Sequence, residues 1–250
     1  MTTVTTQAVS TDRDAWLRLL ARWGLLTAVA VIGLMVAFFG ALAAVSSQPG
    51  AGGTADELLM ATHAPGLYRI AMVLDAAGWL FMGGLIVIAG LALRREATIR
   101  GPLAAALGVT AITGVIGAFL RLTVVGDLGR QFSAASADGE GILSLYRSVQ
   151  WMISAHFDAG QLTMGLGFLV VGSAALGVAW VPRVVGWLLV LPGLTSLVLL
   201  VGEVAFDVFL FPVLLLHVVL LAVLGLAVAR TWWRPARPVV AGPETAPGTT

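Results

Sequence analysis

Several charged or hydrogen-bonding side chains lie inside segments that are otherwise apolar. Charges are costly in hydrocarbon, about 2.5–3.5 kcal/mol each on insertion scales, so such groups usually face a bundle interior, pair with one another and line functional sites. The candidate site residues are Asp75, Arg121, His156, Asp158, Gln161, Glu203 and His217. Their residue types and their shared depth predict a polar cluster that binds a ligand or an ion.

Arg121 is the natural partner for one of the two carboxylates at similar depth. A guanidinium binds a carboxylate bidentately and keeps its charge, so we expect an ion pair between Arg121 and either Asp75 or Asp158. Three uses of this pair stay open: a salt bridge between helices that only locks the bundle, a site for a ligand or ion, and proton coupling.

Metal and cofactor chemistry is less favoured by the sequence. His156 and His217 could ligate a b-type haem between facing helices, but their expected depths differ by more than a turn. The same two histidines and His63 could bind zinc with a carboxylate, although no HxxxH or HExxH spacing occurs. No phosphate-binding loop, nucleophile elbow or nucleotide fingerprint occurs either. We therefore expect no cofactor and no metal, and enzymatic activity is disfavoured.

The composition is that of a membrane protein. Of 250 residues, 59% are hydrophobic and 11% charged, whereas soluble domains carry about 25% charged residues. The net charge of +1 gives no reason to expect nucleic acid as a partner. The absence of cysteine excludes disulfides and thiolate metal sites. Every basic residue is arginine, which together with the alanine, glycine and valine content is typical of a GC-rich bacterial genome.

The apolar residues fall into six segments that can each cross a membrane. Runs of 18 or more apolar residues span a hydrocarbon core about 30 Å thick, and backbone groups in lipid require helices or a closed barrel. The predicted fold is therefore all-α, an integral membrane bundle of six transmembrane helices. The segments are 24–45, 67–93, 103–125, 152–181, 184–204 and 206–229.

The predicted transmembrane domain covers residues 16–233. Residues 1–15 form a polar cytoplasmic tail that we expect to fray, and residues 234–250 a disordered cytoplasmic tail. The external loop at 126–149 is long enough to form a lid or a short surface helix, although its Ser/Ala/Gly/Asp content predicts no rigid structure. The first apolar run could instead be a signal peptide, because Ala41 and Ala43 resemble a cleavage site, but it is longer than the 7–15 residues of a usual apolar region.

The distribution of arginine predicts the orientation. With six alternating segments, the same side receives the arginines before the first segment, between the second and third, between the fourth and fifth, and after the sixth. Short arginine-rich loops stay in the cytoplasm. We therefore expect both termini in the cytoplasm of a cell inner membrane, and the candidate residues near the outer leaflet, where they line a polar pocket open to the outside.

Two parts of the chain resemble each other. Leu67-Tyr68-Arg69 precedes Asp75 and Gly78, as Leu145-Tyr146-Arg147 precedes Asp158 and Gly160. The segments that follow end alike, in Val-Gly-Asp at 125–127 and Val-Gly-Glu at 201–203. This similarity predicts a tandem repeat of helices 2–3 and 4–5, although chance similarity between Ala/Gly/Leu-rich helices is the alternative.

Small residues and prolines complete the pattern. Glycines in the second, third and fourth segments allow helices to approach closely. Pro192 and Pro212 each predict a kink, because proline removes a backbone hydrogen bond.

The chain resembles an uncharacterised bacterial family of multi-pass membrane proteins, classed as a domain of unknown function. The similar segments are 65–69, 154–157 and 181–187, and the resemblance covers roughly residues 60 to 205. It implies a membrane bundle and no established activity.

The leading hypothesis is an inner-membrane protein that binds or transports a small molecule or ion in an outward-facing polar pocket. A structural or regulatory membrane subunit without a ligand is the alternative, followed by a b-type haem protein. Expected partners are the lipid bilayer, a small-molecule or ion ligand, and a second copy or another membrane protein.

Overall fold

A computed structural model describes residues 3–48, 56–132, 139–206, 208 and 210–233, and every regular element in these ranges is helical. The segments are α1 (Thr3–Val45), α2 (Asp56–His63), α3 (Pro65–Ala92), α4 (Arg100–Ala111), α5 (Gly114–Leu120), the π-helical turn η1 (Arg121–Val125), α6 (Gly126–Gln131), α7 (Gly139–Leu176), α8 (Arg183–Phe206) and α9 (Phe211–Trp232).

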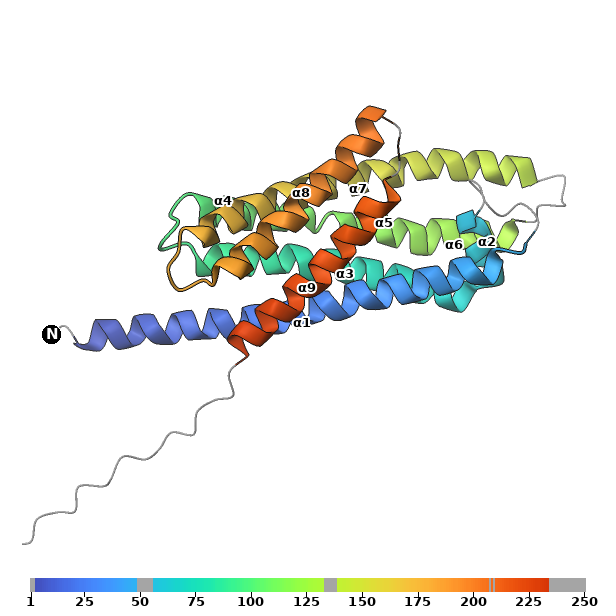
Figure 1. The fold of residues 1–250 in the computed structure, drawn as a ribbon. Helices are drawn as coiled ribbons and strands as arrows, with labels where there is room; N and C mark the ends of the chain where they lie inside the picture. The colour runs from blue at the N-terminus through green and yellow to red at the C-terminus, as the bar shows by residue number, and fades with distance from the viewer. Residues whose placement is uncertain (1–2, 49–55, 133–138, 207, 209, 234–250) are drawn as a thin grey trace, which may run out of the picture.

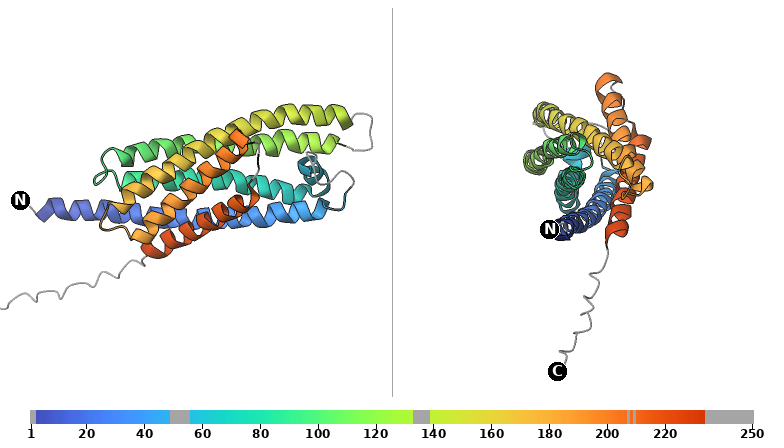
Figure 2. Two further views of the ribbon diagram at one scale, coloured as in Figure 1. Left: turned by 45° about the horizontal axis from the view of Figure 1, so that its top comes forward. Right: turned by 90° about the vertical axis from the view of Figure 1, so that its left-hand side faces the viewer.

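Six stretches of the described chain are long and apolar enough to cross a membrane. They are α1 from Asp14, α3, the run from α4 to α6, α7 from Glu140, α8 and α9. Each packs against the next along the chain, and α9 returns to α1, so the bundle closes into a ring in chain order (Figures 1 and 2). The chain is an all-α, multi-pass membrane protein, as predicted.

The ends of the helices differ from the predicted ones. Helix α1 is helical from Thr3, through most of the segment expected to fray, and α7 begins at Gly139 instead of residue 152. Residues 126–131 extend the third span as α6 and are not loop. The predicted C-terminal tail, 234–250, lies outside the described residues.

The two prolines behave differently. Pro192 lies inside α8. Pro212 stands in the first turn of α9, where helical N–H groups have no partner within the helix in any case. The predicted kink at Pro212 is therefore wrong, because α9 begins at Phe211 and not at residue 206.

Glycine pairs hold the backbones of α3 and α4 together at two levels, and those of α7 and α8 likewise. A Cβ atom on one glycine of each pair would lie within 3.1 Å of the other's carbonyl oxygen. The pairs are Gly83 with Gly108 and Gly90 with Gly101, then Gly165 with Gly193 and Gly172 with Gly186. Both seams have the same seven-residue spacing on each helix, a regularity that supports the predicted tandem repeat.

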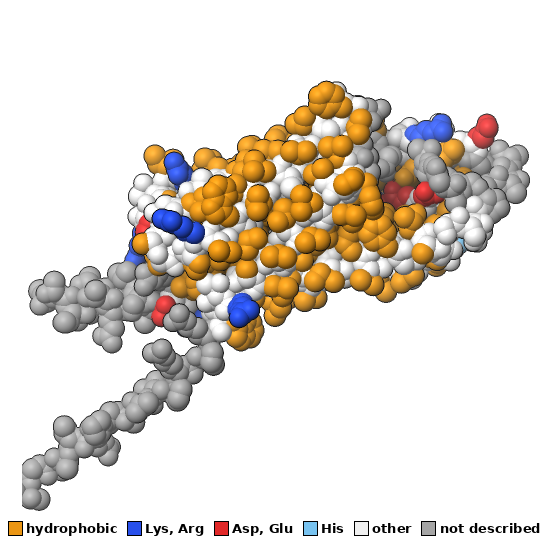
Figure 3. All heavy atoms as spheres, in the orientation of Figure 1, with side chains coloured by type: hydrophobic (Ala, Val, Ile, Leu, Met, Phe, Trp, Pro, Cys, Tyr) orange, Lys and Arg blue, Asp and Glu red, His pale blue; other side chains and the backbone are white. Residues whose placement is uncertain are grey.

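On the face that Figure 3 shows, the charged side chains lie toward the two ends of the bundle, with apolar side chains over its length. We call one end the Arg94 end; its exposed arginines are Arg18, Arg22, Arg94, Arg95, Arg100, Arg183 and Arg230. We call the other the Glu57 end; it carries α2, η1, α6 and the beginnings of α3 and α7. The buried core divides accordingly, with one apolar cluster centred on Phe168 and Ile86 and another on Tyr68 and Ile153.

Candidate functional site

A carboxylate at the Glu57 end collects hydrogen bonds from two helices. Tyr68 Oη of α3 donates to Glu57 Oε1 at 3.1 Å, and Tyr146 Oη of α7 donates to Glu57 Oε2 at 2.8 Å. These are the only two tyrosines of the chain, and both are buried. Glu57 therefore joins three helices, because it lies on α2 itself.

Helix α2 inserts this carboxylate between the longer helices. Four consecutive residues, Leu58 to Ala61, are buried, and α2 contacts α1, α3, α6 and η1. Thr62 Oγ1 fixes it by donating to the carbonyl oxygen of Gly129 at 2.5 Å. Glu57 stands in the first turn of α2, where a negative charge complements the helix dipole.

Arg121 is the basic member of the network. Its Nε lies 3.5 Å from Glu57 Oε1, and its guanidinium carbon lies 4.4 Å from the centre of the Phe157 ring on α7. The Nε atom is buried and has no hydrogen-bond partner among the residues that the structure describes. The predicted ion pair of Arg121 with Asp75 or Asp158 is thus wrong as a direct contact, because Glu57 is the closest acid.

A π-helical turn positions Arg121. The turn widens the third span at Arg121–Val125, so the N–H of Gly126 reaches back five residues to the Arg121 carbonyl oxygen. Tyr68 Oη also lies 3.0 Å from this oxygen. The single Tyr68 proton is therefore shared between a carboxylate and a backbone carbonyl, and π-turns of this kind often mark functional sites.

Asp75 lies next to this network on α3. Its carboxylate is within hydrogen-bonding reach of the Trp79 indole, and the charges of Arg121 and Glu57 both act on it. No ion pair joins it to any side chain in the described ranges. The network thus contains two acids and one guanidinium, a composition that can exchange ion-pair partners or hold one additional positive charge.

The other predicted site residues lie elsewhere. His156 Nδ1 interacts with the Met152 carbonyl oxygen of its own helix at 2.9 Å. No hydrogen bond or ion pair links Asp158 to another side chain whose position is described, and Glu203 is exposed near the end of α8. These three residues do not join the Glu57 network.

Gln161 and His217 belong to a second polar group that ties α8 to its neighbours. Gln161 Nε2 donates to the Ser196 carbonyl oxygen at 3.1 Å, and Ser196 Oγ donates to the Gln161 carbonyl oxygen at 3.0 Å. Buried His217 pairs through Nδ1 with Thr195 Oγ1 at 2.8 Å. These contacts connect α7, α8 and α9.

The predicted haem and zinc alternatives gain no support from this placement. Helix α8 contacts both α7 and α9, whereas α7 and α9 do not pack against each other to any comparable extent. His156 and His217 therefore do not face one another across a helix interface. Among the residues with described positions, no group of three or more His, Cys, Asp or Glu side chains could hold a metal ion.

A hollow opens next to the network. It measures about 780 Å³, including its open mouth, and lies between α2, α3 and α6. Its lining is Ala61, Thr62, Pro65, Gly66, Tyr68, Arg69, Gly126 and Arg130. Tyr68 belongs to both the hollow and the Glu57 network, so the two are directly connected.

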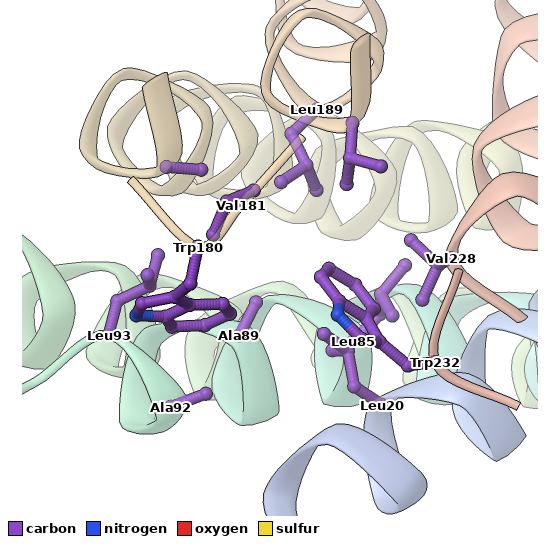
Figure 4. A pocket seen from close by; sticks show the side chains of 12 residues that line it. Leu20, Leu85, Ala89, Ala92, Leu93, Trp180, Val181, Leu189, Val228 and Trp232 are labelled. Atoms are coloured by element: carbon purple, nitrogen blue, oxygen red, sulfur yellow. The ribbon is translucent and has the colours of Figure 1, made fainter. Parts of the chain in front are cut away.

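The Arg94 end is closed by apolar side chains. Trp180, between α7 and α8, and Trp232 of α9 point into a wholly apolar pocket that α1 and α3 complete (Figure 4). The two indole rings lie 6.4 Å apart, edge to face. Apart from the two indole rings its lining is aliphatic, so the pocket offers water few hydrogen-bond partners.

Sequence reasoning missed Glu57, both tyrosines and Phe157. Glu57 lies before the second apolar run and resembles a loop acid. The tyrosines did carry a signal, because both stand in the repeated Leu-Tyr-Arg at 67–69 and 145–147, which was interpreted only as evidence for a repeat.

The chain matches no protein-family model, no curated protein and no solved structure.

Proposed function

We propose that the protein binds a small molecule or an ion at its Glu57 end, as one step of transport across the bacterial inner membrane. The observation that carries this proposal is the charge composition of the network. Two acids, Glu57 and Asp75, share one guanidinium inside a membrane bundle. Arg121 Nε lies 3.5 Å from Glu57 without a hydrogen bond, and among the described residues the Asp75 carboxylate has no ion pair. Charges in such places usually serve ligand or ion pathways.

The proposed binding step is an exchange of partners. Arg121 pairs with Glu57 at 3.5 Å, a distance longer than a good charge-assisted hydrogen bond. A ligand that engages Glu57 or Tyr68 would release Arg121 toward Asp75. The exchange would alter contacts among α2, α3, η1 and α7 together, because each of them contributes a member of the network.

The proposed orientation places the Glu57 end outside the cell and both termini in the cytoplasm. Its support is the arginine count, since seven exposed arginines gather at the Arg94 end and such clusters stay on the cytoplasmic side. In this orientation the hollow opens to the outside, and the apolar side chains around Trp180 close the Arg94 end on the cytoplasmic side. We further propose membership of the uncharacterised bacterial membrane family that the sequence resembles.

A structural or regulatory subunit is the second candidate. The observation that favours it is the internal satisfaction of Glu57, which receives hydrogen bonds from both tyrosines of the chain itself. Such a network could simply fix helix positions. A stable membrane partner co-purifying with the protein in mild detergent would favour this candidate.

The experiment compares two aspartates at similar depth. Wild type, Asp75→Asn and Asp158→Asn are purified in detergent, and thermal unfolding is followed with monovalent and divalent cations, amino acids, carboxylates and inorganic phosphate. We expect at least one class to stabilise the wild type and Asp158→Asn but not Asp75→Asn. Folded Asp75→Asn protein with every response unchanged would contradict the proposal. Should Asp75→Asn fail to fold, Glu57→Gln takes its place under the same criterion.

A further inference from the structure

The hollow between α2, α3 and α6 has a chemical character that the Glu57 network does not explain. Two charged side chains line it, Arg69 from α3 and Arg130 from α6, and no acidic side chain does. We propose that this hollow binds an anionic group, a phosphate or carboxylate, between Arg69 and Arg130. The inference deepens the proposed function and rests on it, because it names the class of ligand that approaches the network.

Arg69 is available for such a ligand. Its side chain is exposed at the rim, and within the described part of the chain no hydrogen bond or ion pair occupies its guanidinium. A guanidinium has five N–H donors in a planar fork that matches carboxylate and phosphate oxygens. Arg69 can therefore give an anion two parallel hydrogen bonds.

Arg130 retains donors as well. It pairs with Asp127 one turn earlier on α6, and both side chains are about 60% exposed. One carboxylate uses at most part of the five donors, so the remaining N–H groups can face the hollow. The charges lining the hollow are positive, and Asp127, which does not line it, is paired with Arg130.

The hollow has room for an occupant. A Cβ atom placed on Gly66 or Gly126, which both line it, would meet nothing within 4 Å. Thr62 is engaged with backbone carbonyl oxygens, which leaves the two arginines as the groups that determine ligand charge.

The position of these arginines also runs against the topological bias. In the proposed orientation they lie outside, whereas arginine in short loops favours the cytoplasmic side. Binding an anion gives them a function there. An anion bound in the hollow would then affect the Glu57 network through Tyr68, because Tyr68 lines the hollow and donates to Glu57.

The anion could come from two sources, a phospholipid headgroup of the outer leaflet or a free solute. The experiment uses delipidated protein, with inorganic phosphate as one probe and phosphatidylglycerol as the other. Sodium chloride at equal ionic strength and zwitterionic phosphatidylcholine are the respective controls. The variants are Arg69→Gln, Arg69→Gln with Arg130→Gln, and Arg183→Gln, which removes an exposed arginine at the Arg94 end.

We expect wild type and Arg183→Gln to bind one of the two probes above its control. We expect Arg69→Gln to bind it at least about tenfold more weakly, because charge-assisted hydrogen bonds to the anion are lost. Phosphate binding indicates a free solute, and binding of phosphatidylglycerol alone indicates a lipid headgroup. Equal binding by wild type and both Arg69 variants, or binding of neither probe, would overturn the inference.

A further variant separates this inference from the proposed function. If Glu57→Gln binds the probe with wild-type affinity while Arg69→Gln does not, the hollow is an anion site and the coupling to the network is absent. If both variants lose binding, hollow and network act together.

Discussion

Glu57 determines the geometry of the candidate site, although it lies on a helix of only eight residues. It receives both tyrosine hydroxyl groups of the chain and the nearest guanidinium. Two hydroxyl donors and one guanidinium therefore depend on this single carboxylate. Removing the acid would leave Tyr146 without its acceptor and Arg121 without its ion-pair partner, and Tyr68 would keep only the Arg121 carbonyl oxygen.

Replacement of Glu57 should therefore cost more than replacement of either tyrosine. For Glu57→Ala we expect the free energy of unfolding to fall by about 3–5 kcal/mol, because Arg121 loses its ion-pair partner and both tyrosines lose a charged acceptor. For Tyr146→Phe we expect a fall of about 1–3 kcal/mol, because one hydrogen bond to a charged group is lost. Reversible unfolding in mixed detergent micelles measures both. Glu140→Gln, at the exposed beginning of α7, is the control and should change little. If Glu57→Ala lowers the free energy of unfolding no more than Glu140→Gln does, the network does not stabilise the bundle.

Arg121 gives a second residue-scale prediction through its contact with Phe157. A guanidinium over an aromatic face contributes about 0.5–2 kcal/mol, and lysine has no planar group to stack there. A double-mutant cycle with Arg121→Lys and Phe157→Leu should show a coupling energy of about 0.5–1 kcal/mol. If the two substitutions change the free energy of unfolding additively, the 4.4 Å contact between Arg121 and Phe157 contributes nothing to stability.

At the residue scale the sequence located part of the site. Asp75 and Arg121 stood out because ionisable groups within long apolar runs are rare, and both lie at the network. The central acid did not stand out, because Glu57 precedes its apolar run and nothing local marks α2 as an inserted helix. Residue type alone also could not separate His156, whose imidazole interacts with its own helix, from a ligand-facing histidine.

At the element scale, two hairpins built on glycine seams carry the site. Helices α3 and α4 approach as closely as their backbones allow, and so do α7 and α8. Small residues at membrane helix interfaces permit this packing, which gains van der Waals contact in the absence of a hydrophobic driving force.

Adding one methyl group to a seam should loosen its hairpin. In Gly193→Ala the new Cβ would lie 2.8 Å from the Gly165 carbonyl oxygen, and overpacking of this kind costs about 1–3 kcal/mol. Gly141→Ala in α7 is the matched control, because nothing lies within 4 Å of its Cβ position. The measurement is the free energy of unfolding in detergent. Equal values for Gly193→Ala and Gly141→Ala would contradict the close approach of α7 and α8.

The polar link between α8 and α9 makes a further element-scale prediction. Thr195→Val keeps the shape of the side chain but removes the hydroxyl that pairs with His217, and interhelical hydrogen bonds in membranes contribute about 0.6–1.7 kcal/mol. Thr163→Val is the control, since the Thr163 hydroxyl bonds only to carbonyl oxygens of α7 itself. If Thr163→Val lowers the free energy of unfolding more than Thr195→Val does, the hydrogen bond between Thr195 and His217 does not stabilise the contact of α8 with α9.

The six spans were predictable from apolar run length, because no other feature produces such runs. Their irregularities were not. The third span tightens at Ile112 and Thr113, where N–H groups reach back three residues, and widens at η1, yet no proline marks either place. Helix α7 extends 13 residues before its predicted start, through polar residues, and on this extension Tyr146 is buried and donates to Glu57 of α2.

At the scale of the whole molecule, the bundle has two unlike ends. The Glu57 end holds both signs of charge, a hollow and shared hydrogen bonds, whereas the Arg94 end holds arginines around an apolar pocket. The sequence predicted this separation from loop charges alone. It could not predict which acid Arg121 contacts, because that depends on how the inserted helix α2 meets the ring of long helices.

The orientation of these ends is the claim on which the proposed function most depends, and the absence of cysteine makes it directly measurable. Two single-cysteine variants are used. Gly66→Cys places the thiol in the hollow at the Glu57 end, and Gly177→Cys places it in the pocket beside Glu96 and Arg100 at the Arg94 end. Both positions leave room for a Cβ atom. The measurement is labelling by a thiol reagent that cannot cross membranes, applied to intact cells and then to permeabilised cells.

We predict that Gly66→Cys is labelled in intact cells and that Gly177→Cys is labelled only after permeabilisation. Labelling of Gly177→Cys in intact cells, with Gly66→Cys protected until permeabilisation, would place the Glu57 network on the cytoplasmic side and contradict the account of an outward-facing site.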